Sequence, residues 1–304
     1  PPRSTLFPYT TLFRSKDEVI CTAYYAYLAQ IMAEMAVVIG KDGDAARFSA
    51  LHDNIRNAFI AAFVDGDGRI LESSQTGYAL AFAFDLLPKE VRAAAADRFV
   101  EEIAKFDWHL ATGFIGTPRL LPALTQAGRE DVAYRLLMNT TFPSWLYQVK
   151  LGSTTMWERW NGWTPETGFA DPGMNSFNHY AFGAVGEYIY DHVAGILPGD
   201  IGFRNVILRP RPGGGLTSAK LAYRSIRGTI VSDWALIDGK MRLSVEVPPN
   251  VTATICLPVA ALNDVTVDGK PIENARIERG EMRCDIGSGK YTFEAPYTAP
   301  APMK

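Results

Sequence analysis

The sequence predicts a helical domain followed by a separate, strand-rich domain. Apolar residues recur every three or four positions over residues 16–196, as they do on one face of a helix. From residue 197 onward the period changes to two, which is the period of a β-strand. Asp-Gly pairs at 238–239 and 268–269 are strong signals for tight hairpin turns. A chain of 304 residues is also long enough for two domains.

Residues 16–196 are predicted to form a series of helices separated by short and long loops. The expected helices are 16–39, 44–63, 76–87, 88–105, 118–128, 130–138, 144–151 and 175–193. The turn at 65–68 (DGDG) resembles part of a calcium loop, but it lacks the downstream glutamate that would complete the site. Such a series of helices is typical of a toroid of helical hairpins, with its long loops on one rim.

Residues 197–296 are expected to form an antiparallel β-sandwich of short strands. In one strand, four apolar residues alternate with polar ones and should face the core: Met241, Leu243, Val245 and Val247. This part has no clustered titratable groups, which favours a packing role over the alternative of sugar binding. Residues 297–304 are expected to form a frayed tail.

Composition excludes several classes of partner. The net charge is −3 and no basic run is present, so neither nucleic acid nor a membrane surface is an expected partner. No apolar run reaches membrane-spanning length. The three cysteines, Cys21, Cys256 and Cys284, are far apart and are interpreted as free thiols. We expect no metal or other cofactor, and the sequence indicates neither an oligomeric state nor a cellular location.

Residues 1–15 (PPRSTLFPYTTLFRS) are expected not to be native protein. The segment repeats itself, contains no acidic residue and has no helical period. Residues 5–15 resemble the translation of a sequencing adapter, and a disordered native leader is the alternative. We exclude the segment from the fold. On the adapter interpretation, the chain is expected to be the C-terminal part of a longer protein, with the native N-terminus lying outside it.

The segment 155–163 (TMWERWNGW) carries the strongest chemical signal. Glu158 lies among the indoles of Trp157, Trp160 and Trp163. Indole faces bind the C–H faces of sugar rings, and a carboxylate between them can move protons at an anomeric centre. The alternative is that the tryptophans belong to a core and that Glu158 is a solvated or ion-paired acid. The Gly-, Pro-, Asn- and Asp-rich surroundings favour a functional loop.

Three motifs together resemble the bacterial α-L-rhamnosidases of glycoside hydrolase family 78. They are residues 110–117 (LATGFIGT), 154–160 (TTMWERW) and 176–183 (SFNHYAFG). The resemblance extends over nearly all of residues 16–296. It implies an incomplete (α/α)6 toroid followed by a C-terminal β-sandwich. It also implies hydrolysis of a terminal α-L-rhamnosyl bond with inversion and without a metal cofactor, so a rhamnose-containing glycoside or oligosaccharide is the expected partner.

The resemblance also implies roles for individual residues. Glu158 matches the family's general base, and His179 matches a histidine that contacts the sugar. The walls of the sugar site are expected to come from two loops and to comprise Trp157, Trp160, Trp163, Trp108 and His109. The family's general acid lies upstream of the residues present here, so this chain alone is expected to be inactive. Glu166 and Asp171 share the loop with Glu158 and are interpreted as loop anchors.

Two other functions stay open at this point. One is a short form that binds rhamnose without cleaving it. The other is a different helical-toroid carbohydrate enzyme, either another glycosidase or a lyase. A lyase would use a base such as His179 or Tyr180 beside a charge neutraliser such as Arg159. Binding of rhamnose rather than a uronate would distinguish the two enzyme classes. The aglycone and the linkage are not indicated.

Overall fold

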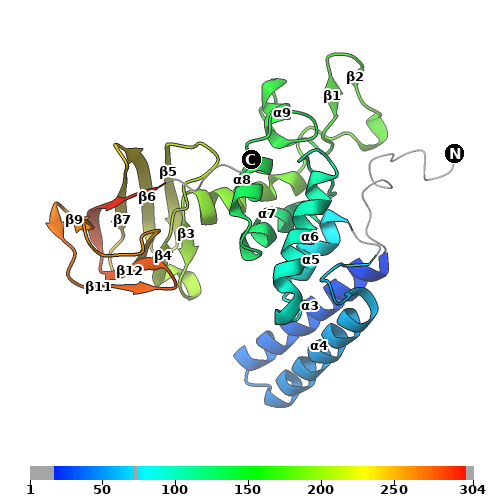
Figure 1. Ribbon diagram of the computed structural model, residues 1–304, viewed down its shortest axis with the longest axis horizontal. Helices are drawn as coiled ribbons and strands as arrows, with labels where there is room; N and C mark the ends of the chain where they lie inside the picture. The colour runs from blue at the N-terminus through cyan, green and yellow to red at the C-terminus, as the bar shows by residue number, and fades with distance from the viewer. Residues whose placement is uncertain (1–16, 72–73, 299–304) are drawn as a thin grey trace. The chain divides into compact units, whose positions relative to one another are not determined.

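The computed structural model describes residues 17–71 and 74–298, which divide into two compact units (Figure 1). The helical unit ends at Ala184, and the strand unit begins at Val185. The leader predicted at residues 1–15 lies outside the described residues, as does most of the predicted tail. The sequence predicts a domain boundary at residues 196/197, which differs from this division, and that boundary stays a prediction. In the parts that are described, no helix combines the length and the apolar character needed to cross a bilayer.

The predicted helices up to residue 151 are all present in the helical unit, with ends shifted by a few residues. The elements are α3 (Asp17–Val38), α4 (Asp42–Phe63), α5 (Gln75–Ala83), η1 (Lys89–Val91), α6 (Arg92–Ala104), α7 (Thr117–Gln126), α8 (Glu130–Leu137), α9 (Trp145–Lys150), β1 (Trp163–Thr164), β2 (Gly168–Phe169), η2 (Pro172–Met174) and η3 (Ala181–Ala184). The segment 65–68 is a turn, as predicted: the Gly68 N–H donates to the Asp65 carbonyl at 3.1 Å.

Helix α5 forms the centre of the helical unit. Every residue from Gln75 to Phe82 is buried, and the helix contacts α3, α6 and α7. A helix that is apolar on all sides belongs inside a fold rather than at its surface. The helix begins at Ser74, whose hydroxyl accepts a hydrogen bond from the Thr76 N–H and so satisfies one of the free donors of the first turn.

Gln75 ties this central helix to the loop before α7. Its side-chain N–H donates to the His109 carbonyl at 3.0 Å, and its side-chain oxygen accepts from the Ala111 N–H at 2.9 Å. The side chain is fully buried. Since an unpaired buried amide is costly, these two bonds fix the loop in one position against α5.

The prediction of a helix at residues 175–193 is wrong for the first part of that range. Residues 175–180 are not helical, and η3 is followed by two short pieces, α10 (Val185–Tyr188) and the π-helix η4 (Ile189–Val193). The Glu158 N–H instead donates to the Ser176 carbonyl, and the His179 N–H donates to the Met156 carbonyl. This pairing uses the backbone groups that a helix would need, so a long-range contact overrides the local preference.

The strand unit contains two sheets. Its elements after η4 are β3 (Ile196–Pro198), η5 (Ile201–Phe203), β4 (Asn205–Leu208), β5 (Ser218–Ser225), β6 (Gly228–Ile237), β7 (Lys240–Val247), β8 (Thr252–Leu257), β9 (Thr266–Val267), β10 (Lys270–Pro271), β11 (Ala275–Glu278), β12 (Glu281–Ile286) and β13 (Gly289–Pro296). One sheet has the order β10-β9-β13-β7-β6-β5, and the other has the order β11-β12-β8-β4-β3.

Most sequence predictions for this unit are confirmed. The inward residues of β7 are those predicted, and the Asp-Gly pairs connect β6 to β7 and β9 to β10. Asp238 and Gly239 have φ values of 48° and 74°, as expected for a two-residue hairpin turn. One pair departs from the antiparallel prediction, because β4 runs parallel to β8. Tyr297, in the predicted tail, is held by its N–H, which donates to the Gly239 carbonyl at 2.9 Å.

Strand β6 anchors the segment that enters the strand unit. The Trp234 indole N–H donates to the Val193 carbonyl at 2.8 Å, and the Ser232 hydroxyl donates to the Ala194 carbonyl at 2.6 Å. Both side chains are fully buried. The next residue, Gly195, has a φ of 75°, and its carbonyl accepts from the Arg209 N–H at 2.7 Å. Only a residue without a side chain fits this close approach.

We therefore expect Gly195→Ala to destabilise the strand unit by at least about 3 kcal/mol. A Cβ atom at this position would lie 2.1 Å from the Pro210 nitrogen, which is a backbone atom and cannot move aside alone. Urea unfolding followed by tryptophan fluorescence measures the change. The matched control is Gly43→Ala in α4, where a Cβ would meet nothing within 4 Å. An equally small effect of both substitutions would contradict the close approach.

A second prediction concerns Asp191 in the π-helix η4. Burial raises the pKa of its carboxyl from 3.8 to about 6, and the nearby Glu187 carboxylate adds to the shift. The folded state therefore binds a proton more tightly than the unfolded state, so ionising Asp191 costs stability as pH rises from about 4 to about 6.

Asp191→Asn should remove this cost and increase the free energy of unfolding at about pH 7.5 by roughly 1 kcal/mol, a value reduced for partial solvent exposure. At about pH 3, where the carboxyl is mostly protonated in both states, the gain should be close to zero. Urea midpoints of the two proteins at both pH values measure the effect. An equal gain at both values would show that ionisation of Asp191 is not the cause.

Candidate active site

A short backbone ladder between residues 156–158 and 176–179 organises the predicted site. The His179 N–H donates to the Met156 carbonyl at 2.8 Å, and the Glu158 N–H donates to the Ser176 carbonyl at 2.9 Å. The Thr155 hydroxyl adds a bond to the Phe177 carbonyl. Because the ladder joins two of the three sequence motifs, it brings Glu158 and His179 together.

The Glu158 carboxylate is fixed at one oxygen and open at the other. Its Oε2 accepts the Ser176 N–H at 2.8 Å. Its Oε1 lies 3.9 Å from the Nε2 of His179, which is too long for a direct hydrogen bond. The side chains of Glu158 and His179 are 15% and 23% exposed, so both are partly accessible to solvent. A gap of this length between two polar groups is one that a water molecule can bridge.

The ring orientation of His179 decides where its proton lies. Its Nδ1 accepts the Ala181 N–H at 3.3 Å, so in neutral imidazole the proton is on Nε2, the nitrogen closer to Glu158. The ring stacks on Phe114 at 4.8 Å between centroids and on Tyr180 at 5.3 Å. Phe114 comes from the remaining motif, residues 110–117. All three motifs therefore meet at His179.

Trp160 packs the interior of the loop rather than lining an open surface. Its ring stacks on Phe182 at 4.0 Å and meets Trp145 edge-on at 5.6 Å. It is 6% exposed, and its indole nitrogen has no hydrogen-bond partner among the described residues. Gln148 supports the same region, since its side-chain N–H donates to the Arg159 carbonyl at 2.9 Å. The predicted contact of Trp160 with sugar stays a prediction, and burial of the ring argues against it.

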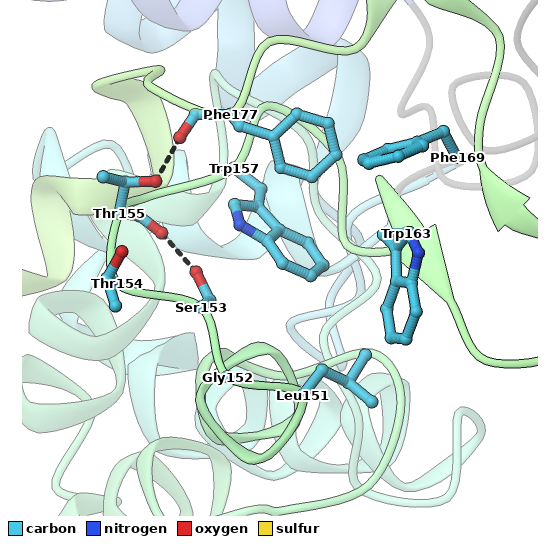
Figure 2. A pocket seen from close by; sticks show the side chains of 9 residues that line it. All are labelled: Leu151, Gly152, Ser153, Thr154, Thr155, Trp157, Trp163, Phe169 and Phe177. Carbon is cyan, nitrogen blue, oxygen red and sulfur yellow. Dashed lines mark hydrogen bonds between the residues drawn. The ribbon is translucent and has the colours of Figure 1, made fainter.

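Trp157 and Trp163 line a cavity of about 340 Å³ (Figure 2). Its lining comprises Leu151, Gly152, Ser153, Thr154, Thr155, Trp157, Trp163, Phe169 and Phe177. Trp163 and Phe169 face each other across the β1–β2 hairpin, and the rings of Trp157 and Phe177 meet edge-on at 5.1 Å. Neither Glu158 nor His179 lines this cavity. Trp157 and its neighbour Glu158 therefore differ in this respect, since only Trp157 contributes to the lining.

Trp108 and His109 belong to a separate network. The Arg135 guanidinium lies 3.7 Å from the Trp108 ring centroid, and the Asn139 side-chain N–H donates to the Trp108 carbonyl at 3.1 Å. The His109 ring contacts the Phe106 carbonyl at 3.1 Å and the Thr141 hydroxyl at 2.8 Å. Within the described residues, no hydrogen bond or ring contact joins this network to Glu158 or His179.

The two other acids of the loop, interpreted as loop anchors, differ in their contacts. Asp171 Oδ1 accepts the Gly173 N–H at 2.9 Å and caps the short helix η2. Glu166 is exposed in the turn between β1 and β2. Asn175 holds the base of that hairpin, since its side-chain N–H donates to the Gly162 carbonyl at 2.8 Å. Across residues 17–71 and 74–298, no group of three or more His, Cys, Asp or Glu side chains gathers as a metal site.

Sequence reasoning did not assign roles to Gln75, Ser176 or Phe114. Gln75 fixes the loop of the first motif, the Ser176 N–H holds the Glu158 carboxylate, and Phe114 supports the His179 ring. Phe114 and Ser176 lie in two of the three sequence motifs, and this position was the signal that could have pointed to a role for them. Nothing in the local pattern around Gln75 distinguishes it from a solvent-exposed glutamine.

In a comparison with known proteins, both units match domains of the same protein family. Residues 9–193 match the family model described as the bacterial alpha-L-rhamnosidase 6 hairpin glycosidase domain. Residues 195–271 match the bacterial alpha-L-rhamnosidase C-terminal domain. The predicted fold class, an incomplete helical domain followed by a strand-rich domain, is confirmed.

Individual relatives are close in sequence and structure. An alpha-L-rhamnosidase of Streptomyces avermitilis is 48% identical over 276 residues, which are 91% of this chain and 26% of that protein. One from Formosa agariphila is 38% identical over 93% of this chain and 31% of that protein. The crystal structure of the Streptomyces avermitilis alpha-L-rhamnosidase complexed with L-rhamnose has a TM-score of 0.86 and 46% identity, covering 93% of this chain and 27% of that one.

This chain therefore spans about a quarter to a third of the length of these relatives. Its helical unit, its strand unit and the three motifs around His179 all agree with one family. The chain belongs to the bacterial α-L-rhamnosidases of glycoside hydrolase family 78.

Proposed function

We propose that this chain carries the general-base side of an inverting α-L-rhamnosidase active site, with Glu158 as the base and His179 as a contact to the sugar or the reacting water. The observation that carries the proposal is the 3.9 Å gap between Glu158 Oε1 and His179 Nε2. A water in this gap accepts a hydrogen bond from the imidazole N–H and donates one to the carboxylate. Both bonds orient its remaining lone pair outward, toward a bound sugar.

The reaction then follows from this geometry. The water oxygen forms a bond to the anomeric carbon while the bond from that carbon to the leaving oxygen breaks. Glu158 takes the proton that the water loses, and a general acid gives a proton to the leaving oxygen. Because Ser176 holds only Oε2, the other carboxylate oxygen of Glu158 keeps its lone pairs for that proton.

The general acid is proposed to lie outside the described residues of this chain. An inverting enzyme needs its two carboxyl groups on opposite sides of the sugar, with room for the water. The loop acids do not meet this need: Asp171 caps its own turn, and Glu166 lies exposed in a hairpin turn. Without the acid, the chain by itself should be slower on unactivated glycosides by a factor of about 10² to 10⁴.

The predicted wall residues have different places in this proposal. Trp157 and Trp163 would contact a ligand in the aromatic cavity, whose lining does not include Glu158. They are therefore separate from the reacting centre. A rhamnose-containing glycoside is the proposed substrate, as in the relatives named above.

Glu158→Gln should lower kcat on 2,4-dinitrophenyl α-L-rhamnoside by at least about 10²-fold. This substrate has a good leaving group, so its hydrolysis depends little on a general acid and reports the base alone. The amide keeps the shape of the carboxylate but cannot take a proton. Glu166→Gln is the matched control and should retain the activity. Full activity of the Glu158 variant would remove Glu158 from the proposed role.

The absence of an acid predicts a steep dependence on the leaving group. Rates of the unmodified chain should fall sharply from 2,4-dinitrophenyl to 4-nitrophenyl and 4-methoxyphenyl α-L-rhamnosides, because the departing oxygen becomes more basic and receives no proton. Proton NMR of the first product should show β-L-rhamnose, as inversion requires. Similar rates for all three substrates would place a general acid within this chain.

Binding separates the alternative functions. L-rhamnose bound without turnover of even the activated substrate would indicate a binding protein. Binding of a uronate in place of rhamnose would indicate a lyase, with His179 or Tyr180 as its base. Calorimetric titration with L-rhamnose and with galacturonate distinguishes these outcomes from the proposed hydrolase.

A further inference from the structure

The aromatic cavity next to the candidate active site has a lining of one chemical type. Four of its nine residues are aromatic: Trp157, Trp163, Phe169 and Phe177. None of the nine is ionisable, and none carries a side-chain amide. Its volume of about 340 Å³ lies in the range of small-molecule sites in proteins, which usually have apolar and aromatic walls. The cavity therefore has the size and the walls of a ligand site.

The β1–β2 hairpin holds two of the rings toward the cavity. Trp163 pairs with Phe169 across the hairpin, and directly opposite residues of an antiparallel pair project to the same face. The Ala170 N–H closes the base of the hairpin by donating to the Gly162 carbonyl at 3.0 Å. The Phe169 ring is 73% exposed, although it meets Phe177 edge-on at 5.5 Å. An exposed large ring beside a cavity is available to cover a ligand that enters.

The two indoles of the lining leave room for a ring between them. Trp157 and Trp163 both line the cavity, yet among the described residues no ring contact joins the two. Figure 2 shows the four rings gathered together, with the hydroxyl-bearing residues to their left. Aromatic rings prefer offset or edge-to-face partners with centroids about 4.5 to 7 Å apart. A flat ring between the indoles would gain such contacts from both.

The polar groups of the lining favour an aromatic ligand over a sugar. Two of the three hydroxyls already donate to backbone carbonyls, that of Ser153 to Thr155 and that of Thr155 to Phe177. A sugar ring carries several hydroxyls, and each needs a hydrogen-bond partner when it leaves water. The lining supplies no carboxylate, amide or guanidinium side chain for them. A flat aromatic ring with a single hydroxyl needs fewer partners and matches the apolar walls.

We propose that the aromatic cavity binds a flat, uncharged aromatic ring, at a site separate from the one that holds the reacting sugar. The ring stacks between Trp157 and Trp163, and Phe169 covers its outer edge. The site is distinct from the pair formed by Glu158 and His179, because neither residue lines the cavity. A free phenolic compound and an aromatic ring attached to a glycoside both carry this chemistry.

Calorimetric titration of the 304-residue chain with 2-naphthol, a flat molecule that is uncharged at neutral pH, tests the proposal. Trp163→Ala should weaken binding at least about tenfold and Phe169→Ala at least about threefold, because each removes a wall of the cavity. The Phe169 variant guards against a folding artefact, since a side chain that is 73% exposed contributes little to the core.

The matched control is Tyr25→Ala in α3, where an aromatic side chain is 54% exposed outside the cavity. This variant should bind 2-naphthol as the unmodified chain does, and so should Glu158→Gln. A saturating concentration of L-rhamnose should also leave the affinity for 2-naphthol unchanged, because the two sites are separate. Circular dichroism melting checks that each variant is folded. None of these measurements needs turnover, so they are independent of the proposed chemistry.

Titration of the Glu158→Gln variant with 2-naphthyl α-L-rhamnoside identifies the source of the ring. Binding at least about tenfold tighter than that of 2-naphthol would indicate a ring attached to a glycoside, because the sugar then adds its own contacts. Equal binding would indicate a free aromatic compound. This arm alone rests on the proposed function.

Three outcomes would overturn the proposal. The first is a folded, unmodified chain that does not bind 2-naphthol. The second is equal binding by the Trp163, Phe169 and Tyr25 variants, which would place the probe outside the cavity. The third is displacement of 2-naphthol by L-rhamnose, which would put both molecules in one site.

Discussion

The candidate site depends on the backbone pairing between residues 156–158 and 176–179. Three groups are fixed by it at once: the backbone of Glu158, its carboxylate through the Ser176 N–H, and the backbone of His179. Backbone bonds of this kind hold side chains more rigidly than a flexible loop can, because they restrict φ and ψ rather than a rotamer. The Phe114 ring and the Ala181 N–H then fix the imidazole. The geometry proposed for the reacting water follows from these restraints.

The same pairing shows what the sequence could and could not predict about this region. Glu158 and His179 could be proposed as site residues because their motifs are specific, and the structure brings the two side chains close together. The apolar period after residue 175 nevertheless predicted a helix, since no local signal shows that Ser176 and His179 give their backbone groups to a distant segment. Helices such as α4 and strands such as β7 were predictable because local period and burial agree there. The parallel pairing of β4 with β8 is likewise a long-range property.

The tryptophans show a further limit of composition. Trp157, Trp160 and Trp163 are indistinguishable as residue types within one short segment, yet they occupy three environments. Trp160 is enclosed by Phe182 and Trp145, Trp157 forms a buried wall of the cavity, and Trp163 lies on a hairpin that faces the same cavity. Packing with residues distant in the chain decides the surroundings of each ring: Trp160 meets Phe182, and Trp157 meets Phe177. An aromatic cluster in a sequence therefore indicates a loop of functional type without showing which rings a ligand can reach.

The proposed function places one physical requirement on the helical unit. A base is useful only when an acid stands across the sugar from it, and a toroid provides this by closing a ring of helices around the substrate. Helix α5, buried along its length against its neighbours, shows how the helical unit holds a helix on all sides. Under the proposed function, Glu158 would be one member of a catalytic pair whose acid a ring of helices brings to the other side of the sugar.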